Sequence, residues 1–448
     1  MQFYCIFSID YENIKGILYS IMLNPLAQEL NNILKGTTPG ELLSDLGQRI
    51  FFPKGIIAQG AEAKKYGNVA NATIGTTIIG GKPAMLESVH KYAPQLSASE
   101  LVAYAPTAGV PELRTLWKEM IFRKNPGLKG KSISLPVLVP GLTAGISYLA
   151  DLFLDSTKPL LAANPSWDNY ALIVEARRNS TLHTFNLFAD GGFDLVSFRE
   201  AVEKEAETGF VRVLLNFPQN PSGYSPTNSE AAQIIKIILN AAEKGARILV
   251  LDDDAYFGLN YENDIYPQSL FAEFADLHEN VLAVKIDGPT KEDFVWGFRN
   301  GFLTFGGKGL TEEHYAALEK KLMGIIRSSV SCSSTPSQSI ALKAFGEPET
   351  ESQKKEFREV LEKRYLKVKE YVSTHKSRNL EPLPFNSGYF MSFHTKVDAE
   401  QLRQKILAEK QIGTISIDSK TLRVAFSSVE ENLIPTVYDA IYQCADNM

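Results

Sequence analysis

The stretch that decides the fold runs from Val211 to Tyr256 and reads VRVLLNFPQNPSGYSPTNSEAAQIIKIILNAAEKGARILVLDDDAY. Its apolar runs at Val211–Leu215 and Ile248–Leu251 predict two buried strands. Between them, from Ser229 to Ala242, apolar residues recur at helical spacing and predict a helix, which Gly245 ends. Strand, helix and strand in this order are typical of a parallel sheet covered by helices, so we expect an α/β fold.

The same alternation continues on both sides of this stretch. Val281–Ile286 predicts the next strand, and Val137–Gly145 predicts a strand, a tight turn and the start of a helix. After Pro348 the pattern changes to a long charged helix, two short strands and a helix between them, which is typical of a smaller α+β domain. We therefore expect a large domain at residues 86–347 and a small C-terminal domain at 348–448. Residues 22–85 are expected to pack with the small domain, after an N-terminal extension at 1–21.

Composition excludes several classes of protein. Of 448 residues, 44% are hydrophobic and 22% charged, which is typical of a soluble globular chain. A net charge of 46 − 52 = −6 without a basic block argues against a nucleic-acid partner. Three distant cysteines favour a reducing compartment, and no window approaches the roughly 18 apolar residues of a membrane span. We expect a cytoplasmic protein that binds neither nucleic acid nor membrane.

Polar residues follow three of the predicted strands. Asn220, Asp253 and Lys291 each come shortly after a strand, and ligands in open α/β sheets bind beyond the carboxyl ends of the strands. We therefore expect these side chains to meet at one edge of the sheet. A lysine in such a crevice loses solvation, and its lowered pKa makes it an imine-forming amine. The alternative is a solvated loop lysine, which is the commoner environment of lysine.

Two further groups point to a flat, charged ligand. Asp253 and Tyr256 place a carboxylate near a phenol, and a carboxylate beside a pyridine nitrogen keeps that nitrogen protonated. Trp167 either stacks on a flat ring or is a partly buried core residue. The turn Gly141-Leu142-Thr143 at a helix start suits a phosphate, although many such turns bind nothing.

An acidic loop or a divalent-metal cluster is the alternative for the three aspartates at 252–254. No metal-binding motif accompanies them, and the six histidines are scattered singly along the chain. We expect no metal site.

Taken in chain order, these motifs resemble those of the class I/II pyridoxal-phosphate-dependent aminotransferases, especially the aspartate aminotransferase-like branch. The resemblance extends from about Asn71 to Ala425. It implies the fold type I architecture, in which helices cover a mostly parallel seven-stranded-type sheet and a smaller α+β domain is attached. The motifs that carry it are Asn71–Gly75, Tyr104–Arg114, Gly141–Thr143, Asn220–Gly223, Asp253–Tyr256, Lys291 with Gly297–Arg299, and Leu422–Ala425.

The resemblance also implies a role for each candidate residue around pyridoxal phosphate and the substrate. Lys291 would carry the cofactor as a Schiff base, Asp253 would bind its ring nitrogen, Asn220 and Tyr256 its ring oxygen, and Gly141, Leu142, Thr143 and Arg299 its phosphate. Trp167 would stack on the ring and, with Asn220, border the substrate; Gly75 would lie in the substrate loop and Arg423 would bind the substrate α-carboxylate. Tyr104 would reach the cofactor phosphate of the neighbouring subunit, so a homodimer with shared active sites is expected.

Three positions depart from the pattern of the branch. Gly288 replaces a serine on the phosphate, Leu142 replaces a small residue, and Cys332 replaces an asparagine near the substrate side chain. Arg327 falls where aspartate-specific relatives bind a distal carboxylate across the dimer interface. A guanidinium suits that task, but a surface or subunit-contact arginine is the alternative.

The expected activity is transfer of the amino group of an L-amino acid to a 2-oxo acid, with 2-oxoglutarate as the acceptor, by a ping-pong mechanism. Aspartate, another dicarboxylic amino acid or an aromatic one is the expected donor. A lyase or decarboxylase on the same cofactor is the nearest alternative, because it would use the same lysine, aspartate and phosphate loop. A non-catalytic regulatory module is disfavoured because all the expected catalytic positions are filled.

Overall fold

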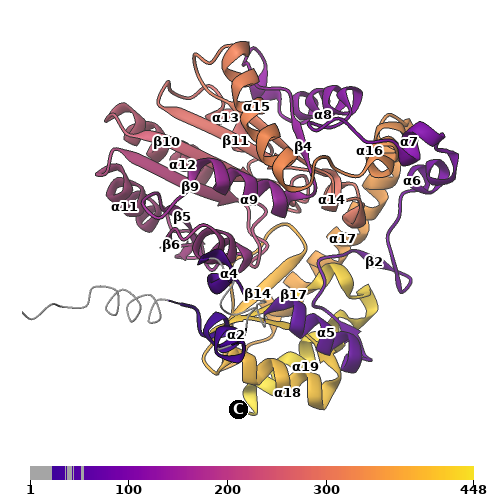
Figure 1. Cartoon of the computed structure of the whole chain (residues 1–448). Coiled ribbons are helices and arrows are strands. Elements are labelled where there is room, and N and C mark those ends of the chain that lie inside the picture. The colour runs from indigo at the N-terminus through magenta and orange to yellow at the C-terminus, as the bar shows by residue number, and fades with distance from the viewer. Residues whose placement is uncertain (1–22, 36, 38–42, 44, 52–54) are drawn as a thin grey trace, which may run out of the picture.

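The architecture of the chain, seen in a computed structural model, is a helix-covered sheet joined to a smaller α/β unit (Figure 1). The structure describes residues 23–35, 37, 43, 45–51 and 55–448, so the predicted extension at 1–21 lies outside the described residues. None of the described helices is both long enough and apolar enough to cross a membrane.

The predicted α/β fold class is confirmed by a seven-stranded sheet in the order β4-β12-β11-β10-β9-β5-β6. β12 pairs antiparallel with both of its neighbours, and every other pair is parallel. The strands are β4 (Val137–Val139), β5 (Leu160–Asn164), β6 (Leu182–Asn186), β9 (Phe210–Asn216), β10 (Arg247–Asp253), β11 (Val281–Asp287) and β12 (Gly301–Gly306).

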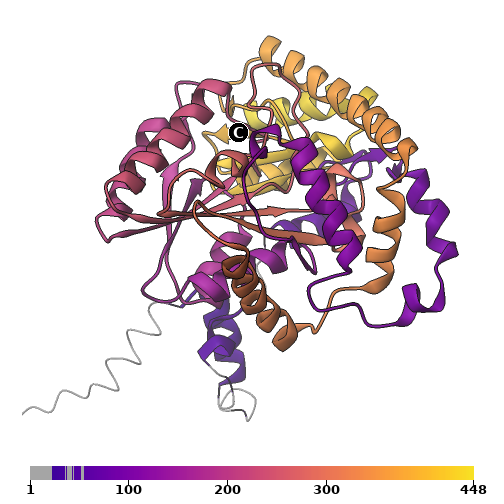
Figure 2. The same ribbon diagram turned by 90° about the horizontal axis from the view of Figure 1, so that it is seen from above.

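Alternation along the strands assigns their side chains to two cores. On β10, Leu249 and Leu251 belong to one buried cluster, and Ile248 and Val250 belong to the other. Helices α9 (Leu142–Phe153) and α15 (Glu312–Ser329) pack together on the first face, and α11 (Leu195–Ala206) and α12 (Asn228–Glu243) pack together on the second (Figure 2). Because successive side chains of a strand point to opposite faces, both faces need an apolar cover.

Further helices and a hairpin complete this part of the molecule. A capping box of Thr227 and Glu230 stabilises the start of α12. The helix begins at Asn228, one residue before the predicted start at Ser229. The others are α6 (Glu87–Tyr92), α7 (Ala98–Val102), α8 (Pro111–Lys124), α13 (Phe271–Phe274), α14 (Pro289–Glu292) and α16 (Thr335–Ala344), with a π-helical turn at Leu172–Arg177 and the hairpin β7 (Phe188–Ala189) with β8 (Gly192–Phe193).

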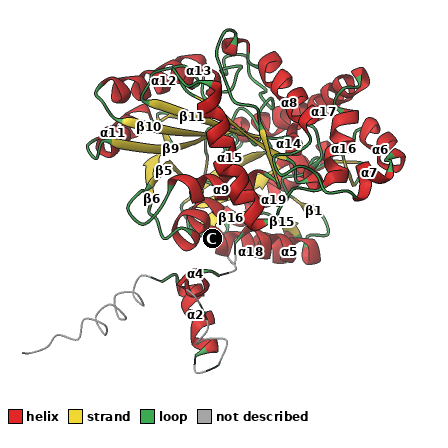
Figure 3. Ribbon diagram, turned by 45° about the horizontal axis from the view of Figure 1, so that its top comes forward, coloured by secondary structure: helices red, strands yellow, loops and turns green. Residues whose placement is uncertain are grey.

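The smaller unit is built on the four-stranded sheet β13-β14-β17-β16, with β13 (Leu380–Pro382), β14 (Phe390–Thr395), β16 (Ile415–Asp418) and β17 (Thr421–Ala425). The long helix α17 (Pro348–Thr374) leads into it, and α18 (Ala399–Lys410) and α19 (Ile434–Asp446) pack against each other beside it (Figure 3).

Segments from the N-terminal part complete this unit. β1 (Ala70–Asn71) pairs in parallel with β15 (Ile412–Gly413), and α5 (Ile56–Tyr66) packs on β15 and β16. β2 (Ile78–Ile79) and β3 (Lys82–Pro83) form a hairpin that leads to the large sheet. α2 (Pro25–Leu34) and α4 (Asp45–Arg49) contact each other, and α4 packs against the π-helical turn at Leu172–Arg177.

Candidate active site

The carboxyl ends of β9, β10 and β11 border a cavity of about 170 Å³. Asp253 and Asn216 are paired in register at the ends of their strands, so their side chains reach the same edge. The structure brings together eight of the predicted residues in this cavity: Leu142, Thr143, Trp167, Asn220, Asp253, Tyr256, Lys291 and Arg299.

Lys291 lies in α14, the four-residue helix that follows β11. Burial lowers the pKa of its amine to about 8; the positive charge of Arg299 also lowers it and the carboxylate of Asp253 opposes the shift. The Nζ atom lies 4.6 Å from the ring centroid of Tyr256, and the hydroxyl of Tyr389 donates to the Lys291 carbonyl at 2.9 Å. Near neutral pH a larger fraction of this amine is therefore unprotonated and nucleophilic than in an exposed lysine.

Asp253 is a buried carboxylate whose oxygens face two donors. The hydroxyl of Tyr170 donates to Oδ2, and the backbone N–H of Ala255 donates to Oδ1 at 3.2 Å. Burial raises the pKa of Asp253 to about 6, while the hydrogen bond from Tyr170 and the charge of Lys291 lower it. These donors favour the charged carboxylate, whereas burial favours the protonated acid.

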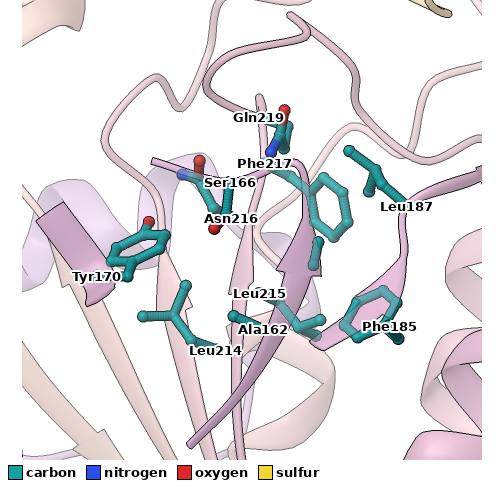
Figure 4. A pocket seen from close by; sticks show the side chains of 11 residues that line it. Ala162, Ser166, Tyr170, Phe185, Leu187, Leu214, Leu215, Asn216, Phe217 and Gln219 are labelled. Carbon is teal, nitrogen blue, oxygen red and sulfur yellow. The ribbon is translucent and has the colours of Figure 1, made fainter. Parts of the chain in front are cut away.

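Tyr170 and Asn216 are site residues that the sequence reasoning missed. Asn216 Nδ2 donates to the carbonyl of Asp253 at 2.7 Å, and Asn216 Oδ1 accepts from the backbone N–H of Asn220 at 2.9 Å. Figure 4 shows both side chains beside a smaller pocket of about 10 Å³ that also includes Ser166 and Gln219. The available signals were the position of Asn216 at the end of its strand and of Tyr170 in the motif that contains Trp167.

Arg423 extends from β17 into the same region and is only 2% exposed. Its Nη1 donates to Asn220 Oδ1 at 3.0 Å and its Nη2 to the Thr73 carbonyl at 3.1 Å, while the buried Nε has no partner in the part of the chain that the structure describes. Burial lowers its pKa to about 10, while Tyr256 and the carboxylate of Asp168 oppose this shift. A buried cation with an unused donor is a strong candidate to bind an anion.

Gly75 permits a close approach beside this arginine. A Cβ atom at Gly75 would lie 3.0 Å from Phe390 Cζ and 3.7 Å from the hydroxyl of Tyr256. The ring of Phe390 also lies 4.3 Å from the guanidinium carbon of Arg423. The predicted substrate loop therefore lies against the groups that surround Arg423.

The opposite end of the cavity offers donors for an anion. Gly141, with φ of 92°, precedes α9, and its missing side chain leaves room for Arg299, whose Nη2 would lie 2.4 Å from a Cβ there. Thr290 lines the cavity, and its buried hydroxyl has no hydrogen-bond partner among the described residues. A helix N-terminus, a guanidinium and an unused hydroxyl together suit a phosphate.

The departures at Gly288 and Leu142 are connected in space. A Cβ atom at 288 would lie 2.7 Å from the carbonyl oxygen of Asn300 and 3.0 Å from Leu142 Cδ1. The leucine thus occupies part of the space that a serine side chain at 288 would need, and Thr290 supplies a hydroxyl in the same cavity.

Two predicted residues lie apart from the cavity in the single chain. Tyr104 is 93% exposed, and Arg327 lies exposed near the end of α15, where its Nη1 donates to Ser331 Oγ at 3.0 Å. Cys332, beside that arginine, is half-buried and has a free thiol.

The carboxylates that flank Asp253 take part in a buried ionic network. Lys285 pairs with Asp254 and lies 3.6 Å from Asp287, and the hydroxyl of Ser269 contacts both Asp252 and Asp254. Among the described residues, no group of three or more histidine, cysteine, aspartate or glutamate side chains is arranged to hold a metal ion.

The fold agrees with the comparisons to known proteins. Residues 78–441 match the family "Aminotransferase class I and II", and the chain belongs to that family. It is 26% identical to a probable aspartate/prephenate aminotransferase of Aquifex aeolicus, over 58% of this chain and 61% of that protein. For the aspartate/prephenate aminotransferase of Thermus thermophilus the identity is 27%, over 48% of this chain and 52% of that protein. The chain therefore spans about half to three fifths of the length of the curated relatives it matches.

The fold is also similar to that of a solved aminotransferase structure. The crystal structure of an aminotransferase from Anaerococcus prevotii superimposes with a TM-score of 0.77 at 24% identity, covering 88% of this chain and 97% of that one.

Enzymes of this family depend on pyridoxal phosphate, and the cavity fits that group. The buried hydroxyl of Thr290 and the start of α9 provide unused donors for its phosphate. A buried acid such as Asp253 would suit the ring nitrogen, and an amine of lowered pKa such as Lys291 would suit the aldehyde. Asn220 presents Oδ1 to Arg423 and also lines the cavity, where its Nδ2 would donate to the ring oxygen.

Proposed function

We propose that this chain is a pyridoxal-phosphate-dependent aminotransferase that moves the amino group of an L-amino acid to a 2-oxo acid. The observation that carries the proposal is that Lys291, Asp253, Asn220, Tyr256, Thr143 and Arg299 line one cavity. An amine, an acid, two ring-oxygen partners and a phosphate site are the groups that this chemistry requires.

Each wall of the cavity would hold a different part of the cofactor. Lys291 would bind its aldehyde carbon, and Asp253 its ring nitrogen. Asn220 Nδ2 and the Tyr256 hydroxyl would bind the ring oxygen. Thr143, Thr290, Arg299 and the amides at the start of α9 would bind the phosphate, and Trp167 would cover the ring. When bound, pyridoxal phosphate supplies an electron sink that stabilises negative charge at the substrate Cα.

The protein's own residues orient the substrate and move its proton. Arg423, with its unused Nε, binds the α-carboxylate and thereby directs the Cα–H bond toward Lys291. Lys291 Nζ accepts the Cα proton as a general base and later donates it as a general acid. The pKa of about 8 suits both tasks, because the amine changes its protonation state near the working pH.

The proposed donor is aspartate, another dicarboxylic amino acid or an aromatic amino acid, and the proposed acceptor is 2-oxoglutarate. Two relatives named as aspartate/prephenate aminotransferases support this choice. Arg327 is proposed to bind a distal carboxylate, and its guanidinium is exposed and donates to Ser331 Oγ.

We also propose a homodimer with shared active sites. Support comes from Tyr104, which is 93% exposed, and from the exposed apolar side chains of Leu101 and Val102 beside it. Exposed aromatic and apolar groups in one segment are typical of an interface.

The proposal is tested by incubating the cofactor-loaded protein with single L-amino acids and no acceptor. An aminotransferase converts its bound cofactor once, to the pyridoxamine form, and stops; added 2-oxoglutarate restores the original absorbance. A lyase or decarboxylase would turn over repeatedly without an acceptor. A protein that remains colourless with pyridoxal phosphate, or a Lys291→Ala variant that retains activity, would contradict the proposal.

A further inference from the structure

The two residues that follow Lys291 are both acidic and face inward. Asp293 is 1% exposed, and the side chain of Glu292 is 18% exposed. Burial raises the pKa of Asp293, although nearby lysines oppose this shift, and Lys124 and Lys354 lower the pKa of Glu292 against its burial. Buried carboxylates are costly unless a cation pairs with them.

Two lysines from different helices pair with these acids. Lys354 Nζ, on α17, lies 2.7 Å from Asp293 Oδ1 and 3.8 Å from Glu292 Oε1. Lys124 Nζ, at the end of α8, lies 2.9 Å from Glu292. Lys354 is itself 7% exposed, so its pair with Asp293 is shielded from water. Glu351, an exposed residue one turn earlier on α17, lies 3.3 Å from Lys354.

Helix α17 also contacts the residue that follows Asp293. The ring of Phe357, on α17, packs edge-on against Phe294 with centroids 5.0 Å apart. Phe294 has φ of 56°, a left-handed conformation that a bulky residue rarely adopts. A backbone in that region keeps its conformation only where surrounding contacts impose it.

The hydroxyl of Tyr389, which precedes β14, donates to the Lys291 carbonyl. The turn from Lys291 to Phe294 is therefore held from three sides, by α8, by α17 and by the segment before β14. Lys291 itself lies in α14, which follows β11 of the large sheet, whereas α17 leads into the smaller unit and Tyr389 precedes its strand β14.

We propose that Lys354 is a positioning residue that sets the place of Lys291 through its buried ion pair with Asp293. The inference rests on the proposed function and deepens it, because it names the contact through which the smaller unit controls the reactive amine. Stability alone gives little reason for such a pair, because apolar residues of similar volume can often replace a buried ion pair without loss of stability. A fixed position of the reactive amine gives a reason to keep the ion pair. A distant mutation that displaces a reacting group by about 1 Å can cost about a hundredfold in rate.

The test compares Lys354→Met, Asp293→Asn, the double variant and Lys354→Arg, with Lys355→Met as the matched control on the exposed side of α17. Three quantities are measured: the rate at which the cofactor-free full chain captures pyridoxal phosphate, kcat and KM with an amino acid, and the melting temperature. Both single variants should lower the capture rate and kcat about ten- to a hundredfold, with KM changed by less than about twofold. Lys354→Arg and Lys355→Met should stay within about threefold of the wild type.

The double variant separates positioning from stability. It leaves no unpaired buried charge at the pair, so its melting temperature should recover toward that of the wild type while capture and kcat stay low. The inference is overturned if the rates recover together with the melting temperature, or if Lys354→Met has wild-type rates. If Lys354→Met does not fold, the double variant decides the question. A wild-type chain that captures no pyridoxal phosphate would contradict the proposed function instead.

Discussion

At the scale of single residues, the balance of charge around Asp253 is the feature on which the proposed chemistry depends. Its burial favours the protonated acid, whereas a pyridine nitrogen needs the carboxylate. Tyr170 shifts this balance toward the carboxylate, because its hydroxyl donates to Asp253 Oδ2 and burial raises the pKa of Tyr170 far above the usual value. Tyr170 therefore acts as a donor throughout the working range of pH.

Replacing Tyr170 with Phe should weaken the binding of pyridoxal phosphate about ten- to a hundredfold and lower kcat, since a hydrogen bond to a charged group contributes roughly 1.5–3 kcal/mol. Titration of the cofactor-free protein, followed by absorbance, measures the affinity. Tyr371→Phe is the matched control, because Tyr371 also donates to a carboxylate, that of Asp439, but in the smaller unit away from the cavity. Equal affinities for the two variants would contradict the role of Tyr170.

The amine of Lys291 gives a prediction about pH. Below its pKa of about 8 the amine is protonated and not nucleophilic, and above it the amine is neutral. The rate at which the cofactor-free protein captures pyridoxal, which lacks the phosphate, should therefore rise with pH around a midpoint near 8. Arg299→Met removes a charge that lowers this pKa, so the midpoint should move upward, by less than about one unit because Arg299 is exposed. A midpoint near the ordinary lysine value in the unaltered chain would show that the amine is not desolvated.

At the scale of elements, the start of α9 and the turn after β11 fit together only because position 288 has no side chain. Gly288→Ala should destabilise the fold by about 1–3 kcal/mol, because its Cβ would press on the carbonyl oxygen of Asn300 and on Leu142. Urea unfolding measures the change. Gly297→Ala is the control, since a Cβ at Gly297 meets nothing within 4 Å; similar losses in both variants would indicate a general effect of replacing glycine.

The elements themselves were largely accessible from the sequence because they rest on local patterns. The predicted strand Val281–Ile286 is β11, which extends one residue further, and the predicted helix from Ser229 to Ala242 is α12, extended by one residue at each end. The pairing of β1 with β15 could not be predicted in this way, because two-residue strands carry no periodicity and their partners are far apart in the chain. The same holds for Tyr170 and Lys354, whose partners come from other elements and are brought near only by tertiary packing.

At the scale of the whole molecule, a single chain leaves part of the expected site unused. Tyr104 does not line the cavity of its own chain and is 93% exposed, although the resemblance gives it a role at a cofactor phosphate. An exposed tyrosine beside exposed Leu101 and Val102 is costly for an isolated chain but useful at a symmetric interface. The proposed dimer accounts for both facts, because each chain would contribute Tyr104 to the other's cavity.

Mixing two inactive variants tests this arrangement directly. Lys291→Ala removes the amine and Tyr104→Ala removes the phenol, so each homodimer should have little or no activity. After the two are unfolded and refolded together, about half of the dimers should be mixed, and in each of these one site has Lys291 from one chain and Tyr104 from the other. Activity should then recover to about a quarter of the wild-type value, because one of two sites is intact in half of the dimers. If Tyr104 served its own chain, every mixed dimer would have one site without the amine and one without the phenol, and mixing would restore nothing.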